Sequence, residues 1–117
     1  MSFKELLFCT DINLGLRNYQ ADSGAVLLDV RVAGEYQRKH IEDALSLPVE
    51  EIDRAPEVIP DRNTPIYVYA YGGETSLRAV KKLRKLGYKN VNDIGGIKKC
   101  CGTQGYQGPW CVEPENG

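Results

Sequence analysis

Residues 65–76 read Pro-Ile-Tyr-Val-Tyr-Ala-Tyr-Gly-Gly-Glu-Thr-Ser and give the clearest sign of how this 117-residue chain folds. The first half, 65–70, is rich in β-branched and aromatic residues, which predicts a buried strand. The chain then passes through Tyr71-Gly72-Gly73 into a segment that begins at Glu74. There the apolar residues recur at helical spacing until Gly87, a typical C-cap. A strand, a short glycine loop and a helix in direct succession favour an α/β domain.

Strand and helix signals alternate on both sides of this stretch. Before it we expect a helix with Asp11 as N-cap, an apolar strand, a short helix, a short strand, and a short helix plus loop, over residues 11–20, 25–30, 33–39, 44–47 and 49–64. After it, a last short strand over 89–94 precedes Gly95-Gly96. The sequence therefore predicts a three-layer α/β fold. Its central parallel sheet has four to five short strands with helices on both faces.

The composition is that of an ordinary soluble domain, with 42% hydrophobic and 26% charged residues. A net charge of -1 recruits neither nucleic acid nor an anionic membrane. No apolar run approaches the ~20 residues that span a bilayer, and the N-terminus lacks the pattern of a signal peptide. We expect one cytoplasmic domain over 1–117, with a core over about 3–97 and an irregular, Cys- and Gly-rich tail over 98–117.

The four cysteines are Cys9, Cys100, Cys101 and Cys111. Without an export signal they are expected to be free thiols, and a disulfide within the cluster or to Cys9 is the alternative. The spacing Cys-Cys-x9-Cys is not that of a zinc site, and the single histidine, His40, lies far away in the sequence. We therefore predict no metal site.

The loop after the 65–70 strand is a candidate anion site, because ligands of parallel sheets bind beyond the carboxyl ends of the strands. Amides of the loop and of the helix start would point inward there. A tight turn without a ligand explains Gly72-Gly73 equally well. Asp29 and Arg31 follow the neighbouring strand at the same edge. Arg31 is a candidate for assisting an anionic ligand, whereas Asp29 is expected to anchor loop amides or to pair with an arginine.

Several ordered motifs resemble the rhodanese-like sulfurtransferase family over roughly residues 3–97. In chain order they are Val26-Leu27-Leu28-Asp29-Val30-Arg31, Glu35-Tyr36, His40-Ile41, Ala44-Leu45-Ser46-Leu47-Pro48, Ile66-Tyr67-Val68-Tyr69, Leu86-Gly87-Tyr88 and Gly95-Gly96-Ile97. They are similar to the family's Asp-Val-Arg strand, its Gly-His-Ile and Ala-x-x-(Ile/Leu)-Pro elements, the strand before its active-site loop, and its Leu-Gly-Tyr and Gly-Gly endings. The resemblance implies the same three-layer fold.

The resemblance also implies a reaction that needs no cofactor. A cysteine at the first loop position takes a sulfane sulfur from a donor such as thiosulfate, forms a persulfide, and passes the sulfur to a thiol acceptor. The family loop usually reads Cys-x-x-Gly-x-(Arg/Thr)-(Ser/Thr/Ala), and Gly73, Thr75 and Ser76 match it. Ala70 occupies the nucleophile position, where a methyl group can neither ionise nor carry sulfur. Glu74 would repel anions unless it points to solvent.

Three functions stay open at this point. The first is a sulfurtransferase domain that is inactive because Ala70 replaces the cysteine, either naturally or by an introduced substitution. The second is a regulatory or protein-binding module that uses the 71–76 loop or the basic face of the following helix. In the third, the thiols of Cys100, Cys101 and Cys111 carry the chemistry, for instance as an acceptor folded over Ala70. The expected partner is a small sulfur-containing anion or a thiol, with a protein partner as an alternative.

Overall fold

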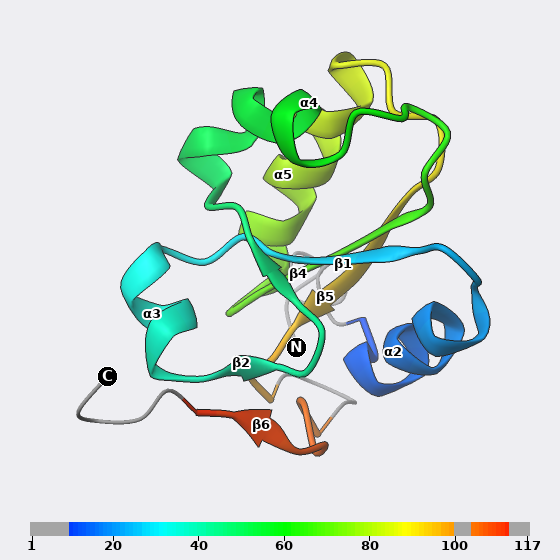
Figure 1. The fold of residues 1–117 in the computed structure, drawn as a ribbon. Coiled ribbons are helices and arrows are strands. Elements are labelled where there is room, and N and C mark those ends of the chain that lie inside the picture. Colours follow the sequence, from blue (N-terminus) through cyan, green and yellow to red (C-terminus); the bar gives the residue numbers. More distant parts are fainter. Residues whose placement is uncertain (1–9, 100–103, 113–117) are drawn as a thin grey trace.

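The computed structural model describes residues 10–99 and 104–112, and their strands and helices form three layers (Figure 1). The central sheet has four parallel strands in the order β3-β1-β4-β5. These strands are β1 (Val26–Asp29), β3 (Leu45–Ser46), β4 (Ile66–Ala70) and β5 (Val91–Gly96). The predicted parallel α/β sheet is confirmed, and each predicted strand is present with bounds that differ by a few residues.

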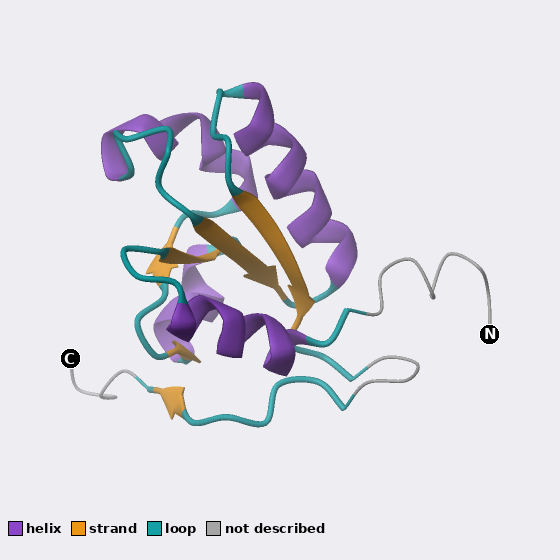
Figure 2. Ribbon diagram, turned by 90° about the vertical axis from the view of Figure 1, so that its right-hand side faces the viewer, coloured by secondary structure: helices purple, strands orange, loops and turns teal. Residues whose placement is uncertain are grey.

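Helices cover both faces of this sheet (Figures 1 and 2). Helix α2 (Ile12–Ala21) packs on one face, and its N-cap is Asp11, whose carboxylate accepts a 3.0 Å hydrogen bond from the Asn13 amide. The other face is covered by the 3-10 helix η1 (Val49–Arg54), by α4 (Ala55–Val58) and by α5 (Gly73–Lys85). Helix α3 (Ala33–Arg38) connects β1 to the short strand β2 (His40–Ile41).

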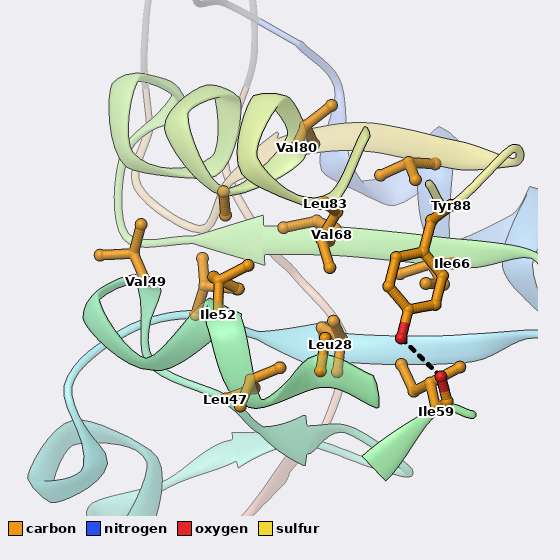
Figure 3. Close-up of a cluster of buried hydrophobic side chains, with 14 of the residues drawn as sticks. Leu28, Leu47, Val49, Ile52, Ile59, Ile66, Val68, Val80, Leu83 and Tyr88 are labelled. Atoms are coloured by element: carbon orange, nitrogen blue, oxygen red, sulfur yellow. Dashed lines mark hydrogen bonds between the residues drawn. The ribbon is translucent and has the colours of Figure 1, made fainter. Parts of the chain in front are cut away.

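Strand β4 is buried along its whole length because its side chains alternate between two apolar layers. Ile66, Val68 and Ala70 belong to the cluster beneath α5, η1 and α4. Figure 3 shows Leu83 of α5 beside Val68 in this cluster. Tyr67 and Tyr69 belong to the second cluster, beneath α2. Burial on both faces explains why the strand reads as an unbroken apolar run.

Within the tail that the sequence predicts to be irregular, the described residues 104–112 contain one short strand. Trp110–Cys111 form strand β6, which pairs antiparallel with β2 in a separate two-stranded sheet, with Cys111 opposite His40. The rings of Trp110 and Tyr106 pack against the cluster beneath α2 and against each other, with centroids 4.8 Å apart. Apolar burial of these two rings therefore orders a segment that has little strand propensity of its own.

Hydrogen bonds to α2 hold the same segment in place. The Asn13 amide group donates to the Gly105 carbonyl at 2.8 Å, and its side-chain oxygen accepts from the Gln107 amide at 3.2 Å. Gly105 has φ +73°, and a Cβ atom there would come within 2.8 Å of the Lys99 amide nitrogen. A glycine is therefore required for the tail to return so close to residues 97–99.

Cys111 is a partly buried free thiol. Cys9, Cys100 and Cys101 lie outside the described residues. The predictions of free thiols and of an acceptor role for these residues therefore stay predictions. Within the described ranges, no helix combines the length and apolar character needed to cross a membrane. Nor do these ranges contain a group of three or more His, Cys, Asp or Glu side chains placed to hold a metal ion.

Candidate active site

The predicted site loop begins where β4 ends at the carboxyl edge of the sheet. Ala70 is completely buried and lies opposite Gly96 of β5. Its carbonyl accepts a 3.0 Å hydrogen bond from the Ile97 amide, and the Tyr71 carbonyl accepts one of 3.1 Å from the Lys98 amide. The first two residues of the loop are therefore fastened to the chain that leaves β5.

Gly96 allows the end of β5 to lie directly against this loop. A Cβ atom at this position would come within 2.7 Å of the Gly72 Cα atom and would collide with the Tyr71 carbonyl. Any residue with a side chain would therefore push β5 and the loop apart. The second glycine of the Gly95-Gly96 motif thus has a direct steric role in shaping the site.

Helix α5 begins immediately after the loop, at Gly73, with Gly72 as an N-cap that offers no side-chain hydrogen bond. The amides of Gly73, Glu74 and Thr75 belong to the first helical turn, where no earlier helical carbonyl is available to them. The Ser76 amide reaches the Gly72 carbonyl at 3.5 Å. Amides without a helical partner can donate to an anion, as the predicted anion cradle requires. Their convergence on a point above Ala70 is a prediction.

The Ser76 side chain is buried between α5 and β5. Its hydroxyl oxygen lies 2.8 Å from an Asp93 carboxylate oxygen and 3.0 Å from the Gly73 carbonyl. Burial raises the pKa of Asp93, and the hydrogen bonds from Ser76 and from the Gly95 amide offset part of that rise. This side chain fastens the start of α5 to β5. Only the backbone of Ser76 therefore remains to take part in the loop.

A buried polar cluster lies at the ends of β1 and β4 on the α2 face. The Asp29 carboxylate accepts hydrogen bonds from the Arg31 amide at 2.9 Å, from its guanidinium at 2.7–3.1 Å and from the Tyr69 hydroxyl at 2.6 Å. The Tyr69 oxygen in turn accepts from the Ile41 amide at 3.1 Å. Arg31 also donates to the Lys39 carbonyl at 2.7 Å. Asp29 therefore pairs with an arginine, which is one of the two roles that the sequence suggested.

The protonation states in this cluster follow from its burial. Burial disfavours the charged form of Arg31, but the hydrogen bond and the charge of Asp29 outweigh it, so the pKa of Arg31 is raised. Burial and the Asp29 carboxylate raise the pKa of Tyr69 far above its ordinary value. Tyr69 therefore remains a hydrogen-bond donor at all physiological pH values, and Arg31 remains a cation held against Asp29.

A pocket of ≈ 450 Å³ connects this cluster to the loop. It brings Arg31 together with Tyr71 and Thr75, two of the predicted site residues, whereas Asp29, Gly72, Gly73, Glu74 and Ser76 are not part of its lining. Its remaining lining residues are Val30, Val32, Glu35, Val49 and Arg78.

These remaining residues were not among the site residues predicted from the sequence. Val49 reaches the pocket from η1, and Arg78 reaches it from the second turn of α5. Arg78 belongs to the basic face of α5 that the sequence indicates. Its guanidinium forms an ion pair with Glu50 at 3.2 Å. The available signal was the helical phase, because Arg78 lies three residues after Thr75 and so shares its side of the helix.

The protein is thus an α/β domain whose candidate site follows an inner parallel strand. There the chain passes from β4 through a short loop into the start of α5. The family described as Rhodanese-like domain matches residues 15–102. The chain therefore belongs to the rhodanese-like sulfurtransferase family. This match extends past the predicted core limit at residue 97.

Sequence and structure comparisons agree with this assignment. The chain is 36% identical over 72 residues to the thiosulfate sulfurtransferase PspE of Escherichia coli, covering 61% of this chain and 69% of PspE. It is 34% identical over 74 residues to the thiosulfate sulfurtransferase GlpE of Coxiella burnetii, covering 62% and 68%. A solved structure described as a rhodanese with anions from E. coli superposes with a TM-score of 0.60 at 32% identity, covering 72% of this chain and 99% of that one.

Proposed function

We propose that this chain is a sulfurtransferase domain that binds a small sulfur-containing anion such as thiosulfate at residues 70–76 and does not transfer its sulfur, because Ala70 takes the nucleophile position. The observation that carries the proposal is the intact support around that position. The Ala70 and Tyr71 carbonyls hold the Ile97 and Lys98 amides, and Gly96 leaves room for the loop. A pocket opens beside Tyr71 and Thr75.

The chemistry that this support serves needs only one added atom, the sulfur of a cysteine at position 70. The thiolate of such a cysteine would attack the outer sulfur of thiosulfate, and the S–S bond would break so that sulfite leaves with the electron pair. An acceptor thiolate would then attack the terminal sulfur of the resulting persulfide and release the cysteine thiolate. Amides of the first turn of α5 would stabilise the anionic forms. The methyl group of Ala70 allows binding and no step beyond it.

The relatives support the substrate class. PspE and GlpE are named as thiosulfate sulfurtransferases, and the superposed E. coli protein is described as a rhodanese with anions. The free thiol of Cys111 favours a reducing compartment, so we place the domain in the cytoplasm.

The direct test is the Ala70→Cys variant. After treatment with thiosulfate, mass spectrometry should show one added sulfur atom on Ala70→Cys and none on the parent chain. The variant should also gain thiosulfate:cyanide sulfurtransferase activity. Ala70→Ser is the matched control, because a hydroxyl of similar size cannot form the persulfide. If Ala70→Cys takes up no sulfur, the site is not a latent sulfurtransferase site. The codon for residue 70 in the gene tests separately whether the alanine is native.

A second candidate is a non-catalytic protein-binding module. It is favoured by two exposed apolar side chains on the pocket, Tyr71 at 61% and Val32 at 64% exposure. Exposed apolar side chains that gather at one pocket form a docking surface when they make a continuous patch. A partner captured by the parent chain and lost with Tyr71→Ala, but retained with Val58→Ala at a distant exposed position, would establish this role. Retention with both variants would exclude the loop as the docking surface.

A further inference from the structure

We infer that Lys98 is a further anion-binding residue of the 70–76 loop and that its charge makes the loop selective for small dianions. The inference rests on the proposed function, since it names a residue that serves the same ligand. The sequence motif that ends at Ile97 does not include this lysine. The structure brings it to the loop because the chain that leaves β5 runs alongside Tyr71 and Gly72.

The backbone and the side chain of Lys98 both contact the loop. Its amide donates to the Tyr71 carbonyl at 3.1 Å, which fixes where the side chain starts. A Cβ atom built on Gly72 would lie 3.4 Å from the Lys98 Cε atom and 3.7 Å from its ammonium nitrogen. The same nitrogen lies 5.7 Å from the centre of the Tyr71 ring, within the range of a cation–π contact. The ammonium group therefore lies close to Gly72 and to the Tyr71 ring.

The ammonium group of Lys98 has no neighbouring carboxylate as an ion-pair partner among the described residues. Arg31 is neutralised by Asp29 at 2.7 Å, and Arg78 pairs with Glu50. Lys98 forms no ion pair with any residue in the described parts of the chain. Its charge is thus available to a ligand at the loop. An ammonium also offers three donors that can turn toward a small anion.

The positive charge of Lys98 also counters the repulsion of anions that is expected from Glu74. That carboxylate lies in the first turn of α5 and is exposed to solvent, which screens its repulsion of an incoming anion without abolishing it. An ammonium group beside Gly72 opposes the effect of the carboxylate on the ligand. Because the attraction grows with the charge of the ligand, a dianion such as thiosulfate gains more than a monoanion such as thiocyanate.

The test is a titration of the full chain with thiosulfate, followed through the backbone amide resonances of residues 72–75. Lys98→Ala should weaken binding about two- to fivefold, the range expected when an anion loses an exposed cation. Lys98→Arg should keep most of the affinity. Lys99→Ala is the matched control, because this exposed neighbour has no described loop contact. The Lys98→Ala effect should be smaller for thiocyanate and should shrink as potassium chloride is added.

The outcomes separate this inference from the proposed function. If thiosulfate shifts the loop amides equally in the parent chain and in Lys98→Ala, or if Lys99→Ala weakens binding as much, the role of Lys98 is wrong while the anion site stands. If the parent shows no shift, the proposed binding by the parent chain is wrong. The role of Lys98 is then tested by comparing the thiosulfate concentration needed to load Ala70→Cys with and without Lys98→Ala. An equal requirement overturns the role of Lys98. Failure of Ala70→Cys to load at all overturns the proposed function and this inference with it.

Discussion

On the α5 face of the sheet, β4 ends in the methyl group of Ala70, whereas on the α2 face β1 and β4 end in the cluster of Asp29, Arg31 and Tyr69. The two ends lie at the same edge and are joined by one pocket. Under the proposed function, the first lacks the cysteine that sulfur transfer would need. In the second, every buried polar side-chain atom has a partner. The position proposed for the nucleophile and the buried ion pair therefore lie on different faces, so we expect a substitution at one to leave the other intact.

The largest effect is expected on the polar face, from Asp29→Ala. The change leaves the buried guanidinium of Arg31 without its carboxylate and should lower the free energy of unfolding by about 4 kcal/mol, because an unpaired buried charge is costly. Chemical denaturation measures the loss. The double variant Asp29→Leu with Arg31→Met should recover much of it, since no charge then remains buried. A loss no greater than that of Val58→Ala, at an exposed site, would contradict this view of the cluster.

The apolar face should respond somewhat less to the loss of a single side chain. Leu83→Ala removes a completely buried side chain of α5 and should lower the free energy of unfolding by about 3 kcal/mol, through lost burial and the cavity that remains. Leu14→Ala is the matched control on α2, where the leucine is 49% exposed. Urea unfolding of both variants checks the prediction. Equal losses would show that α5 does not pack on the sheet as described.

A smaller effect should come from the hydroxyl of Tyr69. Tyr69→Phe removes the donor to Asp29 and leaves the buried Ile41 amide without an acceptor, which should cost about 2 kcal/mol. Tyr67→Phe removes a partly buried contact with Asp22 and should cost less. Hydrogen exchange adds a local measurement, because the Ile41 amide should exchange faster in Tyr69→Phe only. Unchanged exchange at Ile41 would mean that this hydroxyl does not hold β2.

The elements around the site could be predicted where the pattern is local. The β-branched and aromatic run of β4, the apolar spacing of α5 and the N-cap at Asp11 are all set by neighbouring residues, and all three are present. The ordered motifs also indicated the family correctly, because they extend over most of the chain. Position 70 was identified as the nucleophile position from the match of the loop to the family pattern, and its role stays a prediction.

The remainder depends on contacts between distant residues. The β2–β6 pair has two residues in each strand, and it is supported by distant contacts of the Trp110 ring. This ring packs on the cluster beneath α2 and lies 4.7 and 6.0 Å from the cationic atoms of Lys39 and Arg31. No local propensity predicts such a pairing. The position of Lys98 likewise follows from the tertiary register between the Tyr71 carbonyl and the chain after β5.

The position of Ser76 depends both on local helical spacing and on a contact with a distant residue, Asp93. This contact leads to the prediction with the smallest expected effect on stability. Its helical spacing from Ala79, Val80 and Leu83 places it on the buried side of α5, where its hydroxyl meets Asp93. The pKa of Asp93 is raised by burial, so the folded state holds this proton at a higher pH than the unfolded state does. The contribution of Asp93 to stability is therefore most favourable below the ordinary carboxyl pKa of 3.8 and declines as the pH rises through the raised value.

Asp93→Asn isolates this contribution, because the amide oxygen can still accept from Ser76 and from the Gly95 amide but does not titrate. Urea unfolding of both proteins at several pH values between about 4 and 7 gives the difference in their free energies of unfolding. That difference should shift against the parent chain as the pH rises, because the parent must then bury a carboxylate. Asp53→Asn, at an exposed site, should show no such shift. A parent chain that gains stability over Asp93→Asn with rising pH would mean that the carboxylate is favoured in the fold, so that the charge of Arg84 and the hydrogen bonds outweigh burial.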